Sequence, residues 1–276
     1  MVSLASIALV LFFLSRYAHS LFYYPDQHNY GHSPQRSGLP YEDVSFKSRD
    51  GTLLTGWFVP AVGKAKGTVL HVHGNAGNVS AHWSFVEWLP QRGFNVLTFD
   101  YRGFGLSHGK PTPQGLLEDT LSALDYVRSR PDVNAERLLV FAQSLGGNNV
   151  IAAVGSGNRA GIQAMVVEAT FYSYSAIAND KLPGSGILLS NKFSAARFIA
   201  ALAPIPLLLL HGTADRVIPF QHSQKLLEKA QPPKELILIP HGEHIAATVE
   251  HGDTYQNAIA AFFETALEAA SSKALP

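Results

Sequence analysis

The segment VFAQSLGG, residues 140–147, sets Ser144 between a short apolar run and two glycines. An apolar strand, a strained turn residue and small residues that let the next helix pass close behind the strand together expose a serine hydroxyl as a nucleophile. The usual spacing is Gly-x-Ser-x-Gly, and Ala142 stands where the first glycine is expected. Its methyl group needs more room but removes no reactive group. We therefore predict that Ser144 is a nucleophile; the alternative is a serine that caps a helix at a tight turn.

A serine hydroxyl is a poor nucleophile at neutral pH and needs a base within hydrogen-bond reach, which is itself held by an acid. The segment HGTADRVIP, residues 211–219, places Asp215 in a loop after an apolar run, and PHGEHIA, residues 240–246, offers two histidines. We predict His244 as the base, because a loop needs a few residues after the strand before a side chain can turn back over the sheet. His241 directly follows the proline that ends the run and is the alternative. For Asp215 the alternative is the capping of the helix that follows.

Two backbone N–H donors aimed at one point are needed to stabilise the oxygen of a tetrahedral intermediate. One is predicted at Leu145, directly after Ser144 and at the start of a helix, where the helix dipole also favours negative charge. The other is predicted at Asn75 in the segment HGNAGN, which by itself is an ordinary glycine-permitted turn. Asp100 and Glu168 also end apolar runs and are competing acids, but they belong to earlier strands than the one before the HGTAD segment.

Other polar features point to packing rather than to a metal or phosphate site. DYRGFGLSHGKP, residues 100–111, is rich in glycine but lacks the spacing of a phosphate-binding loop. His71 and His73 lie on the same side of a predicted strand, yet no third ligand follows at a telling spacing, so we expect no metal. Asn148 and Asn149 begin the helix after the serine and are expected to pack or to bond locally. The chain has no cysteine, which excludes thiolate metal sites and a cysteine nucleophile.

These residues need a frame that brings distant segments to one edge. Continuous rather than alternating apolarity is typical of strands covered on both faces. Such runs occupy residues 68–73, 95–100, 137–142, 164–169, 206–211 and 235–240. Helical patterns between them cover residues 80–92, 113–129, 145–154, 220–230 and 254–270. The alternation predicts an α/β fold with a mostly parallel sheet and helices on both faces.

Two further segments complete this plan. EDVSFKSRDGTLLTGWFVP, residues 42–60, predicts two antiparallel strands joined at Arg49-Asp50-Gly51, which brings the sheet to eight strands. Residues 170–204 interrupt the alternation between the sixth and seventh strands. We predict that this insertion is a short lid.

Composition limits the classes of partner. The 276 residues, 46% hydrophobic and 15% charged, suit a compact fold, and an α/β chain of this length commonly forms one domain. Lysine plus arginine equal aspartate plus glutamate at 21 each, so no excess positive charge is available to neutralise phosphates. Nucleic acid is therefore not an expected partner.

The N-terminus carries a targeting or anchoring signal. MVSLASIALVLFFLS has no charged side chain, and Arg16 follows it. The run is shorter than the roughly 20 apolar residues that span a bilayer. Ala18 and Ser20 are small residues of the kind that precede signal-peptide cleavage, and a buried N-terminal helix is the alternative. We predict a signal peptide or membrane anchor at residues 1–20, a connector at 21–40 and the folded domain at 41–276, in an exported or membrane-anchored protein.

Five segments in order, HGNAGN, DYRGFGLS, SLGG, HGTAD and GEH, resemble the α/β-hydrolase superfamily. Within it the chain looks like the membrane-associated abhydrolase-domain serine hydrolases, a group similar to serine aminopeptidases and monoacylglycerol lipases. The resemblance implies the α/β-hydrolase fold without a cofactor. It also implies a catalytic triad of Ser144, Asp215 and His244 and oxyanion amides at Asn75 and Leu145. The chain departs from the family pattern at Ala142 and in the His-Gly-Glu segment before His244.

The predicted function is a serine hydrolase that cleaves a carboxylic ester or related acyl bond, such as a thioester, through an acyl-Ser144 intermediate. A small-molecule or lipid acyl compound is the expected substrate, with membrane association through the N-terminus. One alternative is an amidase or peptidase with the same triad. Another is a non-catalytic binding module of the same fold, for which Ala142 is the only support. The sequence leaves the acyl and alcohol groups and the oligomeric state open.

Overall fold

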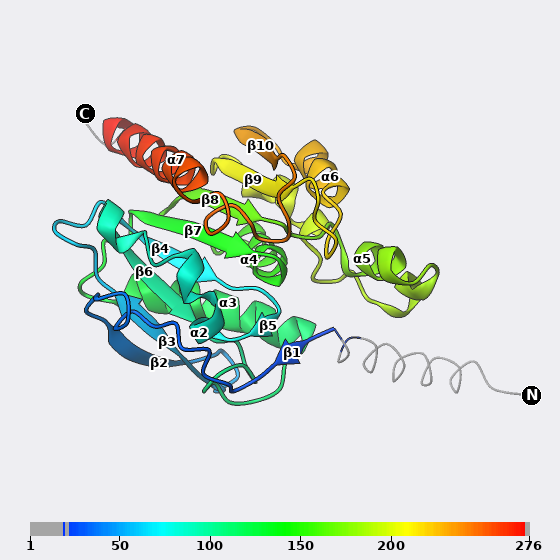
Figure 1. The fold of residues 1–276 in the computed structure, drawn as a ribbon, viewed down its shortest axis with the longest axis horizontal. Coiled ribbons are helices and arrows are strands. Elements are labelled where there is room, and N and C mark those ends of the chain that lie inside the picture. Colours follow the sequence, from blue (N-terminus) through cyan, green and yellow to red (C-terminus); the bar gives the residue numbers. More distant parts are fainter. Residues whose placement is uncertain (1–18, 20–21, 274–276) are drawn as a thin grey trace, which may run out of the picture.

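Six of the apolar runs form parallel strands at the centre of the computed structural model, which describes residues 19 and 22–273 (Figure 1). They pair side by side in the order β10-β9-β8-β7-β4-β6, and the antiparallel hairpin β3-β2 joins at β6 to complete an eight-stranded sheet. The strands are β2 (Glu42–Lys47), β3 (Leu53–Val59), β4 (Gly67–Val72), β6 (Phe94–Phe99), β7 (Leu138–Gln143), β8 (Ile162–Glu168), β9 (Leu207–Gly212) and β10 (Lys234–Ile239). The predicted α/β class and strand number are confirmed.

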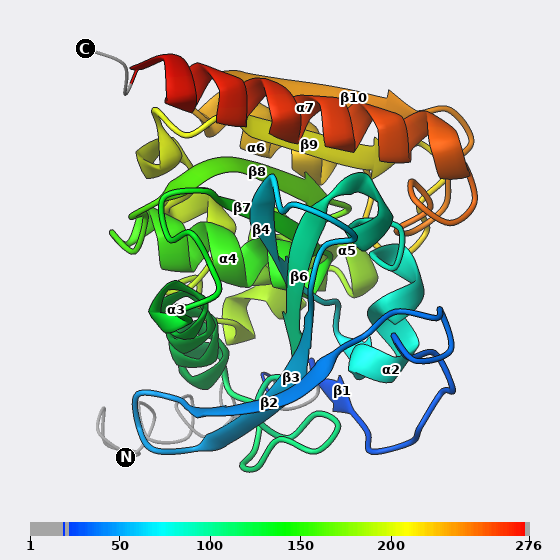
Figure 2. The ribbon, with the colours of Figure 1, turned by 90° about the vertical axis from the view of Figure 1, so that its left-hand side faces the viewer.

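Helices on both faces explain why the strands are apolar throughout. In β4, Leu70 and Val72 belong to one core cluster, whereas Val69 belongs to a second cluster on the other face. The first cluster takes helical residues from α3 (Pro113–Ser129), α4 (Leu145–Gly155), α5 (Tyr174–Lys181) and α6 (Gln221–Lys229), and from two 3₁₀ turns. The second is covered by α7 (Gly252–Lys273), which lies along the β8–β10 side of the sheet (Figure 2). No residue of β4, β6 or β7 is exposed, so alternation of polar and apolar residues is absent.

The single helix predicted over residues 80–92 is wrong. The segment forms a short helix α2 (Val79–His82) and two 3₁₀ turns, η1 (Trp83–Phe85) and η2 (Pro90–Arg92). Pro90 has no N–H to continue an α-helical ladder, and the segment stops at Gly93, whose φ is 85°. Burial of Trp83 and its edge-on contact with Trp57 hold the irregular turns on the core instead.

The insertion at residues 170–204 connects β8 to β9 and has its own short elements. These are α5 (Tyr174–Lys181), η3 (Ser185–Leu188), η4 (Ala195–Arg197) and η5 (Ile199–Leu202). Asn148 of α4 holds the later part, because its Oδ1 accepts from the Ala195 N–H (2.8 Å) and its Nδ2 donates to the Phe193 carbonyl (3.1 Å). Asn148 therefore bonds to distant residues of the insertion, whereas the sequence suggested packing or local hydrogen bonding.

The connector contributes a structural element that the sequence did not predict. Residues Tyr24–Pro25 form a short strand β1 that pairs in parallel with β5 (Ala76–Gly77), in the loop after β4. Figure 1 shows β1 on the same side of the molecule as α5. The signal peptide or anchor predicted for residues 1–20 lies, apart from His19, outside the described residues. Within the described part of the chain, no helix is both long and apolar enough to span a bilayer.

Candidate active site

Ser144 occupies the turn between β7 and α4, and its backbone is strained. Its φ of 52° and ψ of −119° are rarely adopted by a residue with a side chain. The turn aims the hydroxyl into a pocket at the carboxyl ends of the strands, where the residue is 7% exposed. This is the strained strand-to-helix geometry that the sequence predicted.

The small residues around Ser144 let α4 pass close behind the sheet. A Cβ atom added to Gly146 would lie 2.0 Å from the carbonyl oxygen of Val72, and one added to Gly147 would lie 2.5 Å from Val167 Cγ1. Both glycines are therefore required by the packing. Ala142 is fully buried in β7, paired with Val72 on one side, and its methyl group is part of the core. The missing first glycine is thus accommodated inside the sheet.

Three side chains from three loops meet at this edge. His244 Nε2 lies 3.1 Å from Ser144 Oγ and accepts from the hydroxyl, while His244 Nδ1 donates to Asp215 Oδ2 at 2.7 Å. His241 instead is exposed and contributes its backbone N–H to Thr213 Oγ1. Of the two histidines, His244 is the one within hydrogen-bond reach of the serine. An imidazole in this orientation can take the serine proton.

Asp215 is fixed by four hydrogen bonds. Its Oδ1 accepts from the backbone N–H groups of Val217 (2.8 Å) and Ile218 (2.9 Å), and its Oδ2 accepts from His244 and from His211 Nε2 (3.1 Å). Burial acts to raise the pKa of Asp215, but the hydrogen bonds from His211 and His244 outweigh burial and hold the pKa well below its ordinary value. The carboxylate is therefore ionised at neutral pH and able to stabilise a protonated His244.

His211 is a site residue that the sequence reasoning missed. It is the second-last residue of β9, is fully buried, and donates from Nε2 to the Ile218 carbonyl (2.8 Å) as well as to Asp215. The Ile218 carbonyl can only accept, so Nε2 carries the proton, and Nδ1 then accepts from Ser223 Oγ of α6 at 2.7 Å. The available signal was the spacing of four residues between this histidine and Asp215 in HGTAD.

The two competing acids have other partners. Glu168 is buried at the end of β8, where its Oε1 accepts from the backbone N–H of Ala247 (2.8 Å); burial raises the pKa of Glu168. Asp100 Oδ1 accepts from the Val79 N–H at the start of α2 (2.8 Å). Among the described residues, neither carboxylate makes a hydrogen bond to His244.

The two amides predicted to receive an oxyanion lie on the same pocket wall. A Cβ atom built on Gly74 would be 3.5 Å from Ser144 Cβ, so the loop that carries Asn75 lies directly beside the serine. Leu145 N–H begins α4, where the helix dipole is positive. Neither amide N–H donates to another residue in the described part of the chain. No described residue therefore competes with a ligand oxygen for either amide.

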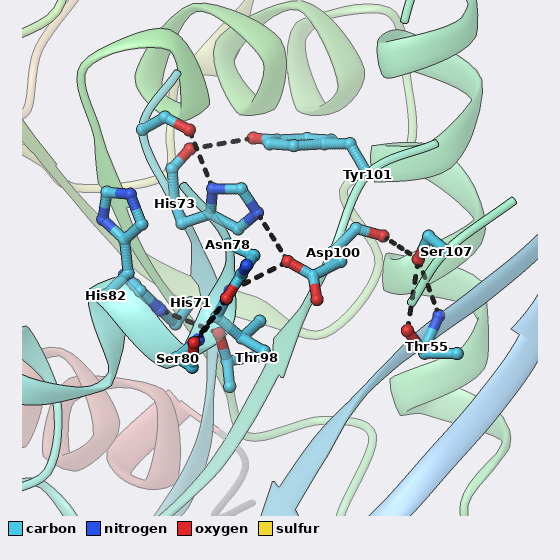
Figure 3. Close-up of polar contacts among 12 residues, drawn as sticks. Thr55, His71, His73, Asn78, Ser80, His82, Thr98, Asp100, Tyr101 and Ser107 are labelled. Carbon is cyan, nitrogen blue, oxygen red and sulfur yellow. Dashed lines mark hydrogen bonds and ion pairs between the residues drawn. The ribbon is translucent and has the colours of Figure 1, made fainter. Parts of the chain in front are cut away.

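Buried polar residues contact the segment that leads to Asn75, and Figure 3 shows His73, Asp100 and Tyr101 among them. Tyr101 of the DYRGFG segment donates its hydroxyl to the His73 carbonyl (3.2 Å), and the His73 ring donates from Nδ1 to the Gly74 carbonyl (2.7 Å). His73 Nε2 lies 3.4 Å from Asp100 Oδ1. Histidines 71 and 73 thus serve packing and hydrogen bonding, and the described residues contain no group of three or more ligand side chains that could hold a metal.

The pocket over Ser144 has a volume of about 730 Å³ and a mostly apolar lining. One wall comes from α5 and the following turn, which contribute Ile177, Leu182 and Leu188. Lys181 is the only lysine, arginine, aspartate or glutamate among the described lining residues. The site therefore brings a serine hydroxyl, an imidazole and two backbone amides together inside a pocket suited to an uncharged apolar chain.

Comparison with known proteins gives matches over most of the chain. The family model described as Hydrolase_4, serine aminopeptidase S33, matches residues 63–198. The uncharacterized protein YfhR of Escherichia coli (strain K12) is 50% identical over 266 residues, covering 95% of this chain and 92% of the relative. The α/β-hydrolase domain-containing protein WAV2 of Arabidopsis thaliana is 33% identical over 255 residues, covering 86% of this chain and 82% of the relative.

Solved structures show the same fold. The esterase Pf2001 of Pyrococcus furiosus superposes with a TM-score of 0.72 at 20% identity, covering 88% of this chain and 98% of that chain. The α/β hydrolase GrgF of Penicillium superposes with a TM-score of 0.70 at 18% identity, covering 83% and 100% of the two chains. At these identities the likeness concerns the arrangement of strands and helices.

Proposed function

The chain belongs to the α/β-hydrolase superfamily, and we propose that it is a serine hydrolase that cleaves a carboxylic ester or related acyl bond. The observation that carries the proposal is the contact of His244 with Ser144 Oγ at 3.1 Å and with Asp215 at 2.7 Å. A binding module would have no chemical need for this arrangement at the base of a pocket.

The proposed reaction has two steps. Ser144 Oγ attacks the acyl carbon while His244 Nε2 takes the serine proton, and the amides of Asn75 and Leu145 stabilise the oxyanion. His244 then gives the proton to the leaving alcohol, whose bond to the acyl carbon breaks. In the second step His244 takes a proton from water, whose oxygen attacks the acyl carbon. The bond between the acyl carbon and Ser144 Oγ then breaks, His244 returns the proton to Ser144 Oγ, and the acid is released. Asp215 keeps the imidazole oriented and stabilises its protonated form.

The lining of the pocket favours an ester over an aminoacyl amide. The substrate of an aminopeptidase carries an ammonium group, which needs a carboxylate or other acceptor when it leaves water. None of the described residues that line the pocket is acidic, and Lys181 would repel the ammonium. An amidase acting on uncharged amides remains the second candidate, supported by the serine aminopeptidase family match.

We further propose that the acyl group belongs to a lipid encountered at a membrane surface. Apolar side chains project into solvent beside the pocket, with Ile187 89% and Leu182 65% exposed and Tyr24 64% exposed across from them. Exposed apolar groups of this kind commonly mark interaction surfaces. The uncharged run at residues 1–15 supports the proposal, because it ends only a few residues before the pocket-lining Phe22.

The first experiment is labelling with a fluorophosphonate, which reacts only with an activated serine. The wild-type protein, Ser144→Ala and His244→Ala are compared, with the modified peptide identified by mass spectrometry. Labelling at Ser144 that disappears in both variants supports the proposal. A folded wild-type protein that resists labelling and hydrolyses no ester favours a binding module. Turnover of nitrophenyl esters against matched aminoacyl and neutral amides then separates the ester and amide candidates.

The membrane part of the proposal is tested with an exposed residue. Ile187→Asn is expected to lower the turnover of an ester embedded in phospholipid vesicles while leaving a short water-soluble ester unaffected. Val62→Asn provides the matched control, since Val62 is 52% exposed and does not line the pocket. Equal vesicle turnover by both variants would argue against a lipid surface at this edge.

A further inference from the structure

Residues 22–25 form an arm that contacts the loop carrying Asn75, whose backbone N–H is a predicted oxyanion donor. Immediately before the β1–β5 pairing, the side chain of Asn75 contacts the arm at two points. Its Nδ2 donates to the Phe22 carbonyl (2.5 Å), and its Oδ1 accepts from the Tyr24 N–H (3.3 Å). The side chain of Asn75 is thus held by the backbone of the arm, while its own backbone N–H donates to none of the described residues.

The arm is itself fastened on its other side to the 170–204 insertion. The Phe22 ring lies edge-on to Phe171, with ring centres 5.7 Å apart, and to Tyr174 at 5.2 Å. Tyr23 is 5% exposed, and its hydroxyl lies 3.2 Å from that of Tyr174. Phe171 and Tyr174 are almost fully and fully buried, respectively. The arm therefore connects the Asn75 loop to the insertion through buried side chains.

The Asn75 loop depends on outside support because of its own sequence. Glycines flank Asn75 at positions 74 and 77, and Gly77 adopts a φ of 75°. Glycine leaves the backbone many alternative conformations, so the loop sequence alone does not fix the direction of the Asn75 N–H. Tyr101 and His73 hold the carbonyls before the residue, and the arm holds its side chain.

We propose that the arm is a working part of the active site, and that the side chain of Asn75 is a positioning group through which the arm aims the oxyanion amide. The inference rests on the serine-hydrolase function proposed above. Removing one oxyanion donor typically costs about 10²- to 10³-fold in kcat. A donor that is present but poorly aimed should cost less, about 10- to 100-fold.

Asn75→Leu tests the proposal, because leucine has a similar size but makes neither hydrogen bond. We expect kcat to fall about 10- to 100-fold with little change in KM, since the pocket and the triad are retained. The inhibition constant of a trifluoromethyl ketone, which forms a tetrahedral oxyanion on the serine, should rise by the same factor. Asn29→Ala is the matched control: Asn29 lies in the same connector, and its side chain accepts only from the local Gly31 N–H.

A second variant approaches the same contact from the arm. Tyr24→Pro removes the N–H that Asn75 Oδ1 accepts, in an exposed and extended segment where proline is tolerated. If Asn75 acts through the arm, the double variant Tyr24→Pro with Asn75→Leu should lose no more than Asn75→Leu alone. Should Asn75→Leu fail to fold, Tyr24→Pro by itself carries the test through a smaller fall in kcat. Because Tyr24 also lines the pocket, Tyr24→Ala, which keeps the backbone N–H, is its control.

The outcomes separate this inference from the function beneath it. An active wild-type protein with unchanged kcat in both variants overturns the role of the arm alone. If Asn75→Leu lowers both kcat and the unfolding midpoint but leaves the inhibition constant of the ketone unchanged, the contact is merely structural. That result would also overturn the role of the arm. A wild-type protein that is neither labelled at Ser144 nor active overturns the proposed function, and the inference falls with it.

Discussion

Gly146 offers a sharp test of how the fold sets the position of the nucleophile. In Gly146→Ala the new Cβ atom would lie 2.0 Å from the Val72 carbonyl oxygen and 2.6 Å from that of His73, where ordinary contact begins at 3.4 Å. The Val72 carbonyl belongs to β4, which is paired with a strand on each side and cannot rotate away. The helix α4 must therefore move outward by more than about 1 Å, and it carries the Leu145 amide with it.

The size of the effect follows from that displacement. Overpacking of a tight core costs about 1–3 kcal/mol of folding free energy. A misplacement of about 1 Å at a catalytic group can cost about 10²-fold in rate. We therefore expect Gly146→Ala to be folded but less stable, with kcat/KM for a nitrophenyl ester and the rate of fluorophosphonate labelling both reduced about 100-fold.

Ala142→Gly is the matched change in the opposite sense. It introduces the first glycine of the motif and removes one buried methyl group from β7, the strand that leads into the turn. The stability should fall by about 1–2 kcal/mol, from the lost methyl group and the freer backbone, with the rate close to that of the wild type. Wild-type rate and unfolding midpoint in Gly146→Ala would refute the reasoning, because close helix packing would then not set the serine.

The other predictions concern the triad. Ser144→Ala should lower turnover by about four to six orders of magnitude without changing the unfolding midpoint appreciably. His244→Ala should abolish labelling, whereas His241→Ala should retain turnover within a few-fold; the reverse result would reassign the base. Asp215→Asn should cost about 10⁴-fold in kcat. Folding lowers the pKa of Asp215, so the stability that its carboxylate contributes is present above pH about 4 and is lost as the pH falls towards the folded-state pKa. Below pH about 4 the unfolding midpoint of Asp215→Asn should therefore fall less steeply than that of the wild type.

The strands and the site residues could be predicted because they follow from local patterns. Runs such as RLLVFA are apolar on both faces, so both sides of the strand must be covered. The carboxyl ends of parallel strands meet at one edge, which brings loops from distant parts of the chain together. Ser144, Asp215 and His244 each follow such an end, and their chain separation therefore did not prevent the prediction of a common site.

The arm and the turns after α2 could not be predicted, because they depend on contacts between distant residues. Nothing in the polar connector marks Phe22 as a partner of Asn75, since the bonds are made by backbone groups that every residue carries. The apolar residues at 80–92 have spacing compatible with a helix, but burial of Trp83 against the hairpin overrides it. In both places contacts with distant residues determine the structure, and the local sequence does not favour it over the alternatives.

A buried chain of hydrogen bonds engages Gln143 and Glu168, which end β7 and β8 but lie outside the proposed triad. Thr98 donates to His71 Nδ1 (3.0 Å; Figure 3), His71 Nε2 donates to Gln143 Oε1 (3.3 Å), and Gln143 donates to Glu168 Oε2 (2.7 Å). Burial and the nearby His73 lower the pKa of His71 to about 3, so its ring is neutral and can both donate and accept.

Every bond in this chain points the same way, from β6 through β4 and β7 to the carboxylate on β8. The remaining oxygen of Glu168 accepts from the backbone N–H of Ala247, three residues after His244. Glu168 is thus engaged in fixing the loop that carries His244, and among the described residues it makes no hydrogen bond to the imidazole. Asp215 is left as the acid because its loop, and not the end of β8, extends to His244 Nδ1.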